Sequence, residues 1–172
     1  MRAHPLRPVH RFTVMALWSK VTLIMRCSYL FLGVLIVGGC ATPPPPSPRG
    51  PELVFQALAT AGVPYRRGGE SAESGFDCSG LVAHVYREAF GVQLPHNALA
   101  QSRMGRYVTL TGLEAGDLVF YNTERRPYSH VGIYLGDHRF IHAPKPGTAV
   151  RIEDMRTAYW TRRFDGARRV VQ

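Results

Sequence analysis

Cys78 has the residue type and the setting of a thiol nucleophile. It lies in the segment 75–80, Gly-Phe-Asp-Cys-Ser-Gly, where a glycine-bearing loop leads into an expected helix. A thiol at a helix start faces unpaired backbone N–H groups and the positive end of the helix dipole, and both favour the thiolate. The same N–H groups are suited to holding an oxyanion. A lone cysteine is also commonly a small buried hydrophobic residue, so the local sequence leaves both interpretations open.

A cysteine nucleophile needs a base, and the base needs a group that orients it. His130 begins one expected strand, and His142 lies on the next. A two-residue turn between these strands would point the imidazoles to opposite faces of the sheet, whereas an odd loop would put them on one face. A common face thus requires an odd loop, such as three residues near 136–138. The relay would be Cys78, His130 and His142, with His142 holding the His130 ring through a ring-nitrogen hydrogen bond.

Apolar spacing and turn residues predict helices first and strands afterwards. The expected helices are 51–61, 78–90 and 97–103. The expected strands are 117–121, 130–135, 139–143, 149–152 and 168–171. This order predicts an α+β domain, in which helices pack on a mostly antiparallel sheet. Two further histidines, His84 in a helix and His138 at a turn tip, are interpreted as structural or solvated.

Five sequence blocks follow one another in a fixed order along this region. They are Phe76–Val82, Leu94–Pro95 with Gln101, Gly116–Tyr121, Ser129–Gly136 and Phe140–Ala143. Together they resemble the NlpC/P60 family of cell-wall cysteine peptidases, and the likeness covers roughly residues 53–171. The resemblance implies a stripped-down papain-like fold. It also implies that Cys78, His130 and His142 are the catalytic residues.

The resemblance further implies a substrate and residues that bind it. Family members cleave peptide stems of peptidoglycan, next to the γ-D-glutamyl–diaminopimelate unit or at the crosslink. Tyr65 matches a family tyrosine near the nucleophile, and Asp77 and Ser79 match flanking residues that help bind the peptide. Asp77 also fits a plain helix N-cap, and the two roles are compatible. Small lipoprotein members usually read Leu-Pro-Arg-Thr or Leu-Pro-Arg-Ser where this chain has Leu-Pro-His-Asn, so His96 puts the details of the substrate subsite in doubt.

The N-terminal segment has the order of an export signal. A positive residue precedes an apolar run over residues 29–37, and two small residues then precede Cys40. The run is short for a lone transmembrane anchor, which stays the alternative. The stretch 37–40, Val-Gly-Gly-Cys, resembles a bacterial lipobox, which implies a signal peptide at 1–39 and a lipidated Cys40. Translation starting at Met25 would explain the long prelude.

A proline-rich segment separates Cys40 from the domain. The linker segment 40–51 carries the lipidated Cys40 and then six prolines (Pro43, Pro44, Pro45, Pro46, Pro48 and Pro51), and its eleven residues 41–51 predict an extended tether of roughly 34 Å. Two or three acyl chains would hold Cys40 on a membrane. The residue after the cysteine is Ala41 rather than Asp, which favours the periplasmic face of the outer membrane. Residues 52–172 are then the catalytic domain, with peptidoglycan stem peptides as its partner.

Charge and cysteine content argue against a nucleic-acid-binding protein and against a domain with an internal disulfide. The chain has 172 residues and a net charge of +9, but five of its 21 basic residues lie in 1–39, which has no acidic residue. The remainder has 16 basic and 12 acidic residues and no long basic run, so we expect no nucleic-acid partner. The mature domain would keep Cys78 alone, which excludes an internal disulfide. We expect a monomer that needs no metal or cofactor.

Three other functions stay open beside a peptidoglycan endopeptidase. One is a lipoprotein that grips stem peptides without cutting them. Another is a zinc hydrolase built on His130, His142 and Cys78, although no HExxH or CxxC spacing supports it. The third keeps the Cys–His pair but works as an amidase or acyltransferase.

Overall fold

The structure is a computed structural model that describes residues 50–171. The predictions for the signal peptide, the lipobox at Cys40 and most of the proline-rich segment lie outside the described residues. Within 50–171, no helix has both the length and the apolar character needed to cross a membrane.

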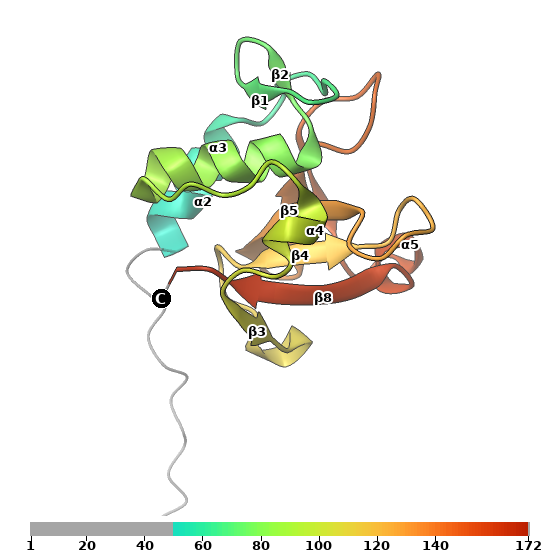
Figure 1. The fold of residues 1–172 in the computed structure, drawn as a ribbon. Coiled ribbons are helices and arrows are strands. Elements are labelled where there is room, and N and C mark those ends of the chain that lie inside the picture. The colour runs from blue at the N-terminus through green and yellow to red at the C-terminus, as the bar shows by residue number, and fades with distance from the viewer. Residues whose placement is uncertain (1–49, 172) are drawn as a thin grey trace, which may run out of the picture. The chain divides into compact units, whose positions relative to one another are not determined.

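Helices α2 (Gly50–Ala59) and α3 (Cys78–Phe90) cover one face of a six-stranded sheet (Figure 1). Two shorter helices are α4 (Ala98–Gln101) and α5 (Ala158–Thr161), and a 3-10 turn, η1, lies at Leu110–Gly112. The sheet strands are β3 (Arg106–Val108), β4 (Leu118–Tyr121), β5 (His130–Gly136), β6 (Arg139–His142), β7 (Arg151–Asp154) and β8 (Phe164–Arg169). Their spatial order is β3-β8-β4-β5-β6-β7, and every neighbouring pair is antiparallel. The α+β prediction is confirmed.

The central helix α3 begins and ends at the residues that its sequence predicts. Asp77 caps its first turn by accepting a hydrogen bond from the Gly80 N–H, and Gly91 ends it with φ +66°. Leu81, Val82 and other apolar side chains on one stripe are buried against the sheet. The position of Cys78 at the helix start is therefore fixed by the cap and by the packing of the helix.

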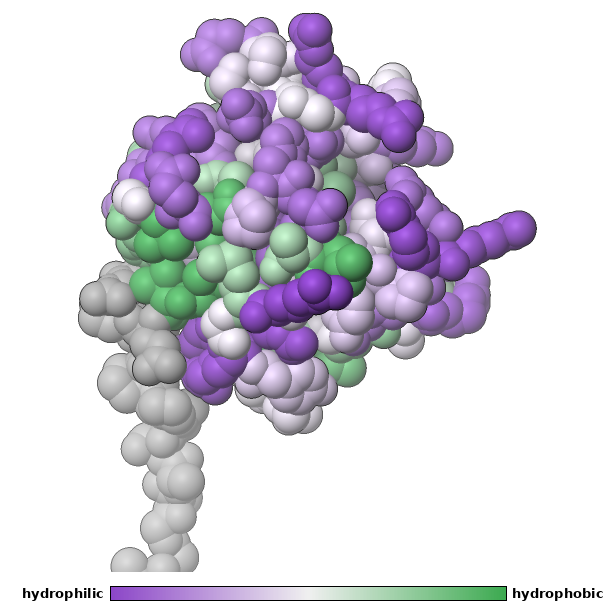
Figure 2. Space-filling model, viewed as in Figure 1, coloured by the Kyte–Doolittle hydropathy of each residue, from purple (hydrophilic) through white to green (hydrophobic). Residues whose placement is uncertain are grey.

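Strand alternation separates two hydrophobic cores. Val131 and Ile133 of β5 face α2 and α3, whereas Tyr134 of the same strand faces the opposite side. The second core also contains Trp160 of α5. Most of the face shown in Figure 2 is polar; its larger apolar area lies over α2 and the end of α3, and a smaller one lies near α4.

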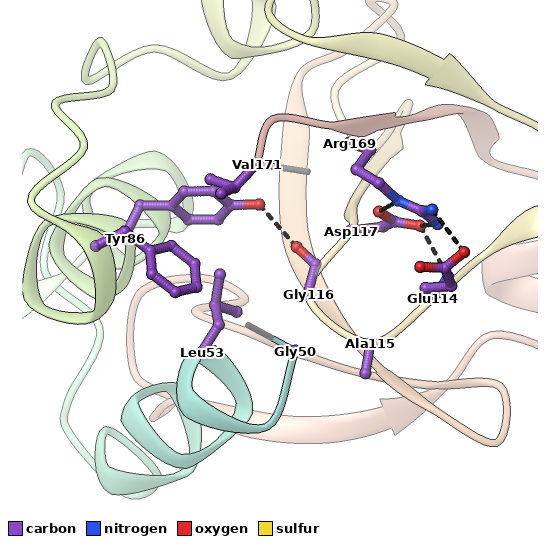
Figure 3. Close-up of a pocket in the computed structure, with 10 residues that line it drawn as sticks. Gly50, Leu53, Tyr86, Glu114, Ala115, Gly116, Asp117, Arg169 and Val171 are labelled. Atoms are coloured by element: carbon purple, nitrogen blue, oxygen red, sulfur yellow. Dashed lines mark hydrogen bonds and ion pairs between the residues drawn. The ribbon is translucent and has the colours of Figure 1, made fainter. Parts of the chain in front are cut away.

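Polar contacts tie the helical layer to the sheet at the end far from Cys78 (Figure 3). The Tyr86 hydroxyl on α3 donates a 2.7 Å hydrogen bond to the Gly116 carbonyl. The neighbouring Asp117 is only 2% exposed, and Arg169 of β8 meets its carboxylate with two bonds of 2.7 and 2.8 Å. The same guanidinium lies 2.6 Å from the Glu114 carboxylate. A buried carboxylate needs such a paired, forked partner, so this cluster holds the start of β4 in place.

The turn between β5 and β6 is not an odd loop. Gly136 pairs with Arg139, so the turn has two residues, Asp137 and His138, with φ +49° and +59°. Positive φ at both positions is the geometry of a tight type I′ hairpin turn. A one-residue irregularity between Tyr134 and Gly136 then shifts the register. The bulge supplies the odd residue that a three-residue loop would have supplied, and the imidazoles of His130 and His142 share one face.

The sequence also missed several short elements. A two-stranded hairpin, β1 (Glu70–Ser71) with β2 (Gly75–Phe76), lies between the first two expected helices, where no element was expected. Strand β3 and helix α5 have only three and four residues, too few for a periodic pattern. Strand β8 begins at Phe164, earlier than expected, because Asp165 and Gly166 interrupt its apolar pattern.

Candidate active site

Asp77 organises the loop that presents Cys78. Its Oδ1 accepts hydrogen bonds from the Gly80 N–H at 2.7 Å and the Ser79 hydroxyl at 3.0 Å, while Oδ2 accepts the Gly68 N–H at 3.0 Å. The His96 Nε2 lies 2.9 Å from the same Oδ1. The N-cap role of Asp77 is thus present in the structure. His96, at the position where the sequence departs from the expected pattern, therefore contacts this carboxylate.

The Cys78 thiol is surrounded by backbone N–H groups but is not a ready thiolate. Burial and the neighbouring Asp77 charge raise the pKa of the thiol to about 11, and backbone hydrogen bonds from Val131, Ser79 and Cys78 itself oppose that rise only in part. The expectation that the helix start favours the thiolate is wrong for this state. Desolvation and a close carboxylate outweigh the helix terminus.

His130 and His142 form a direct hydrogen-bonded pair. Nε2 of His130 lies 2.7 Å from Nδ1 of His142, and the rings meet almost edge-on at 86°. The ring of Trp160 stacks on His130 at 22° and meets His142 edge-on. Burial, and next the neighbouring His142, lowers the pKa of His130 far below its ordinary value. The pair is therefore neutral at physiological pH.

Glu153 on β7 extends the pair into a chain of three groups. Its Oε1 lies 3.5 Å from Nε2 of His142, and its other carboxylate oxygen accepts the indole N–H of Trp160. Arg151 also donates to Oε1, at 2.6 Å. The contacts with His142, Trp160 and Arg151 lower the Glu153 pKa to about 2 against an opposing effect of burial, so the group is an anion. The sequence analysis did not identify Glu153 as a site residue. Its only sequence signal is its position directly after the expected strand 149–152, and that position does not indicate a contact with His142.

This chain of contacts favours one arrangement of protons. Nε2 of His142 makes no hydrogen bond among the described residues, but the Glu153 carboxylate 3.5 Å away can only accept, which favours hydrogen on this nitrogen. Nδ1 of His142 is then an acceptor, and Nε2 of His130 donates to it. The remaining nitrogen of His130, Nδ1, is left unprotonated. Such a nitrogen is what a general base needs.

Two open cavities meet the candidate residues from different sides. The first, of about 320 Å³, is lined by Cys78 together with Tyr65, Asp77, Ser79 and His96, among others. The second, of about 410 Å³, is lined by His130 with Lys145, Arg151, Glu153 and Trp160, among others. Glu124 lines both. Cavities of this size accept a small peptide unit each.

The sheet explains how the thiol and the imidazole come from opposite layers. Cys78 packs with the core on the α3 side, and its sulfur accepts the N–H of Val131 on β5. His130, the preceding residue, points to the other side and bonds to His142. The thiol therefore contacts the backbone next to His130, from the opposite face of the sheet. No hydrogen bond joins Cys78 to His130 among the described contacts, and such contacts often tighten only when substrate binds.

The family model described as NlpC/P60 family matches residues 62–169. The chain belongs to the NlpC/P60 family. The matched region contains both cavities and every residue of the candidate relay.

Curated relatives and solved structures agree with this membership. The chain is 40% identical over 113 residues to "Murein DD-endopeptidase MepH" of Escherichia coli K12, covering 64% of this chain and 42% of the relative. It is 43% identical over 110 residues to "Murein DD-endopeptidase MepS/Murein LD-carboxypeptidase" of the same strain, covering 64% and 57%. The chain therefore spans about half the length of these relatives.

Two crystal structures show the same NlpC/P60 fold. An NlpC/P60 family protein from Bacillus cereus is 32% identical, with a TM-score of 0.67 over 74% of this chain and 42% of that chain. The NlpC/p60 domain of the peptidoglycan hydrolase SagA is 32% identical, with a TM-score of 0.61 over 70% and 97%. These neighbours confirm the predicted fold.

The structure places all six predicted domain residues at these two cavities or directly behind them. Tyr65, Asp77, Cys78 and Ser79 line the first cavity, His130 lines the second, and His142 is buried behind His130. His84 lies elsewhere on α3, where its Nδ1 is 3.0 Å from Arg87. Within residues 50–171, no group of three or more His, Cys, Asp or Glu side chains is arranged to hold a metal ion.

We predict that alkylation of Cys78 by iodoacetamide keeps accelerating as the pH rises from about 7 to about 10, because its raised pKa leaves little thiolate near neutrality. Asp77→Asn keeps a capping side chain and removes the charge that raises this pKa. We expect that variant to react faster at each pH, by roughly tenfold for a pKa lowered by one unit.

The rates are read by mass spectrometry of the peptide that contains Cys78, so the other two cysteines do not interfere. A plateau of the wild-type rate near neutral pH contradicts the assignment. Slower alkylation of Asp77→Asn would contradict the charge effect.

Proposed function

We propose that the protein is a peptidoglycan endopeptidase that hydrolyses amide bonds of the stem peptide or the crosslink by a Cys–His–His thiol mechanism. One observation carries the proposal. A thiol and a neutral imidazole each line a cavity, the residue after the imidazole donates its N–H to the thiol, and a second imidazole and a carboxylate lie behind the first. Two relatives are named murein DD-endopeptidases, which supports this substrate class. Residues 52–172 are the proposed catalytic domain.

The first half of the reaction forms an acyl-enzyme. As substrate binds, Nδ1 of His130 takes the Cys78 proton, and the sulfur attacks the scissile carbonyl carbon. The backbone N–H of Cys78 and the Tyr65 hydroxyl stabilise the oxyanion. Burial, and next the Cys78 and Asp77 charges, raise the pKa of Tyr65, so its phenol stays a donor. The C–N bond breaks as His130 passes the proton to the leaving amine.

The second half releases the acyl group. Nδ1 of His130, again unprotonated, takes a proton from water, and the resulting hydroxide attacks the thioester carbon. The C–S bond breaks, the thiolate recovers the proton from His130, and a carboxylic acid leaves. His142 and Glu153 stay in place throughout and stabilise the transient imidazolium. In the first cavity, Tyr65, Asp77 and Ser79 bind the acyl half of the peptide.

The alternatives are separated by simple comparisons. A protein that only binds stem peptides has no need of an oriented base and a thiol. The row of contacts His130–His142–Glu153 therefore favours catalysis. A zinc hydrolase would lose activity in EDTA, whereas the thiol mechanism would not. An amidase or an acyltransferase would be recognised by its products.

We predict that the purified protein releases new fragments from defined crosslinked muropeptides, and that Cys78→Ala and His130→Ala release none. His142→Ala should keep residual activity, lower by about 10²- to 10⁴-fold, because it removes orientation rather than the base itself. Product masses from mass spectrometry identify the bond that is cut.

Circular dichroism and thermal unfolding serve as the control that each variant is folded. Full activity of Cys78→Ala would refute the mechanism. A folded wild-type protein that yields no fragments but binds the muropeptides would favour the gripping module instead.

We further propose that Cys40 is lipidated, and that the protein is anchored on the periplasmic face of the outer membrane as a monomer. The proposal is supported by the lipobox-like stretch before Cys40 and by the proline-rich segment after it. A tether of roughly 34 Å would let the catalytic domain reach the wall while the acyl chains stay in the membrane.

We predict that Cys40→Ser shifts the protein from the membrane fraction to the soluble fraction of the envelope, because serine lacks the sulfur that carries the lipid. Fractionation followed by immunoblotting reads the distribution. Cys27→Ser is the matched control and should leave it unchanged. Membrane association of Cys40→Ser equal to that of the wild type would instead favour a transmembrane anchor.

A further inference from the structure

The second cavity contains a cation without an acidic partner. Four charged side chains line it, Lys145, Arg151, Glu124 and Glu153. Glu153 accepts a hydrogen bond of 2.6 Å from Arg151, and Glu124 lies 2.8 Å from Arg126. Lys145 forms no ion pair with any residue of the described range 50–171. The positive charge of Lys145 is therefore available to a ligand.

The turn that carries Lys145 is well fixed. Prolines precede and follow it, which restricts the backbone on both sides. The Thr148 hydroxyl donates a 2.5 Å hydrogen bond to the Lys145 carbonyl, and the Lys145 N–H donates to that hydroxyl at 3.3 Å. The Thr148 carbonyl in turn accepts the Tyr65 N–H at 2.8 Å. The turn is thus fastened to the segment that forms a wall of the first cavity.

The order of acyl and proton transfer indicates which half of the substrate each cavity binds. The acyl group becomes attached to Cys78, so the acyl half of the substrate belongs in the cavity that Cys78 lines. The leaving amine must receive its proton from His130, so the other half belongs in the cavity that His130 lines. Lys145 is on that side. Trp160 and Tyr159 give the same cavity an aromatic wall for the carbon chain of the ligand.

We propose that the cavity beside His130 is the subsite for the leaving half of the peptide, and that Lys145 selects a leaving half with a free carboxylate outside the cleaved chain. The inference rests on the proposed function and names the substrate class of the same site. A diamino-acid unit has this chemistry, since one of its amines can form the scissile amide while its carboxylate stays free. An ammonium on a fixed turn pairs with such a carboxylate through charge-assisted hydrogen bonds.

The test uses two crosslinked muropeptides that share the acyl half. They differ only at the diamino-acid carboxyl, which is free in one and a carboxamide in the other. We expect wild-type kcat/KM to favour the free carboxylate by roughly tenfold, the size of one charged hydrogen bond. Lys145→Met should reduce that ratio to about one, and Lys145→Arg should retain most of it. Arg106→Met, an equal loss of charge on β3 at the opposite edge of the sheet, should keep the wild-type ratio.

A wild-type ratio of one, or a Lys145→Met ratio equal to that of the wild type, overturns the inference. Binding of the isolated leaving half, free or amidated, is measured in parallel by calorimetry. If neither muropeptide is cut, the proposed function fails, and binding alone then decides the role of Lys145. In that case, tighter binding of the free-carboxylate form that Lys145→Met abolishes supports the inference. Equal binding of both forms to the wild-type protein overturns it.

Discussion

The hydrogen bond between Nε2 of His130 and Nδ1 of His142 is the interaction on which the proposed chemistry depends. With hydrogen on the nitrogen of His142 that faces Glu153, this bond places the hydrogen of His130 on Nε2 and leaves Nδ1 free to act as a base. Glu153 sets the orientation from the far side of His142, and Trp160 covers both rings and binds the same carboxylate. An isolated histidine on a strand would have neither a fixed tautomer nor a fixed ring plane.

Much of the fold serves to hold that pair and to place the thiol against the start of β5. The bulge in β5 keeps the imidazoles on one face of the sheet, and strand β7 brings Glu153 behind them. On the other face, α3 delivers Cys78 from a start that Asp77 caps. The resting thiol is protonated, with a pKa raised to about 11. Nucleophile and base thus wait as a neutral pair, and substrate binding must bring about the proton transfer.

Local sequence signals predicted the elements that have strong periodicity or clear caps. Helix α3 has both, and its bounds agree with the prediction. The common face of His130 and His142 was also correct, although a bulge and not a longer loop produces it. Glu153 and the state of the Cys78 thiol were out of reach, because both depend on burial and on partners from distant strands. A cap and a helix dipole are visible in sequence, whereas desolvation is a property of the folded chain.

The most direct test of this account is the protonation state of His130, read by nitrogen NMR of the histidine side chains in the wild-type protein and in His142→Ala. We predict a neutral His130 ring with hydrogen on Nε2 across about pH 5.5 to 8, since its lowered pKa keeps the proton off Nδ1 throughout this range. His142→Ala should lose that fixed tautomer. A wild-type His130 that is an imidazolium at about pH 6, or that carries its hydrogen on Nδ1, would contradict the account.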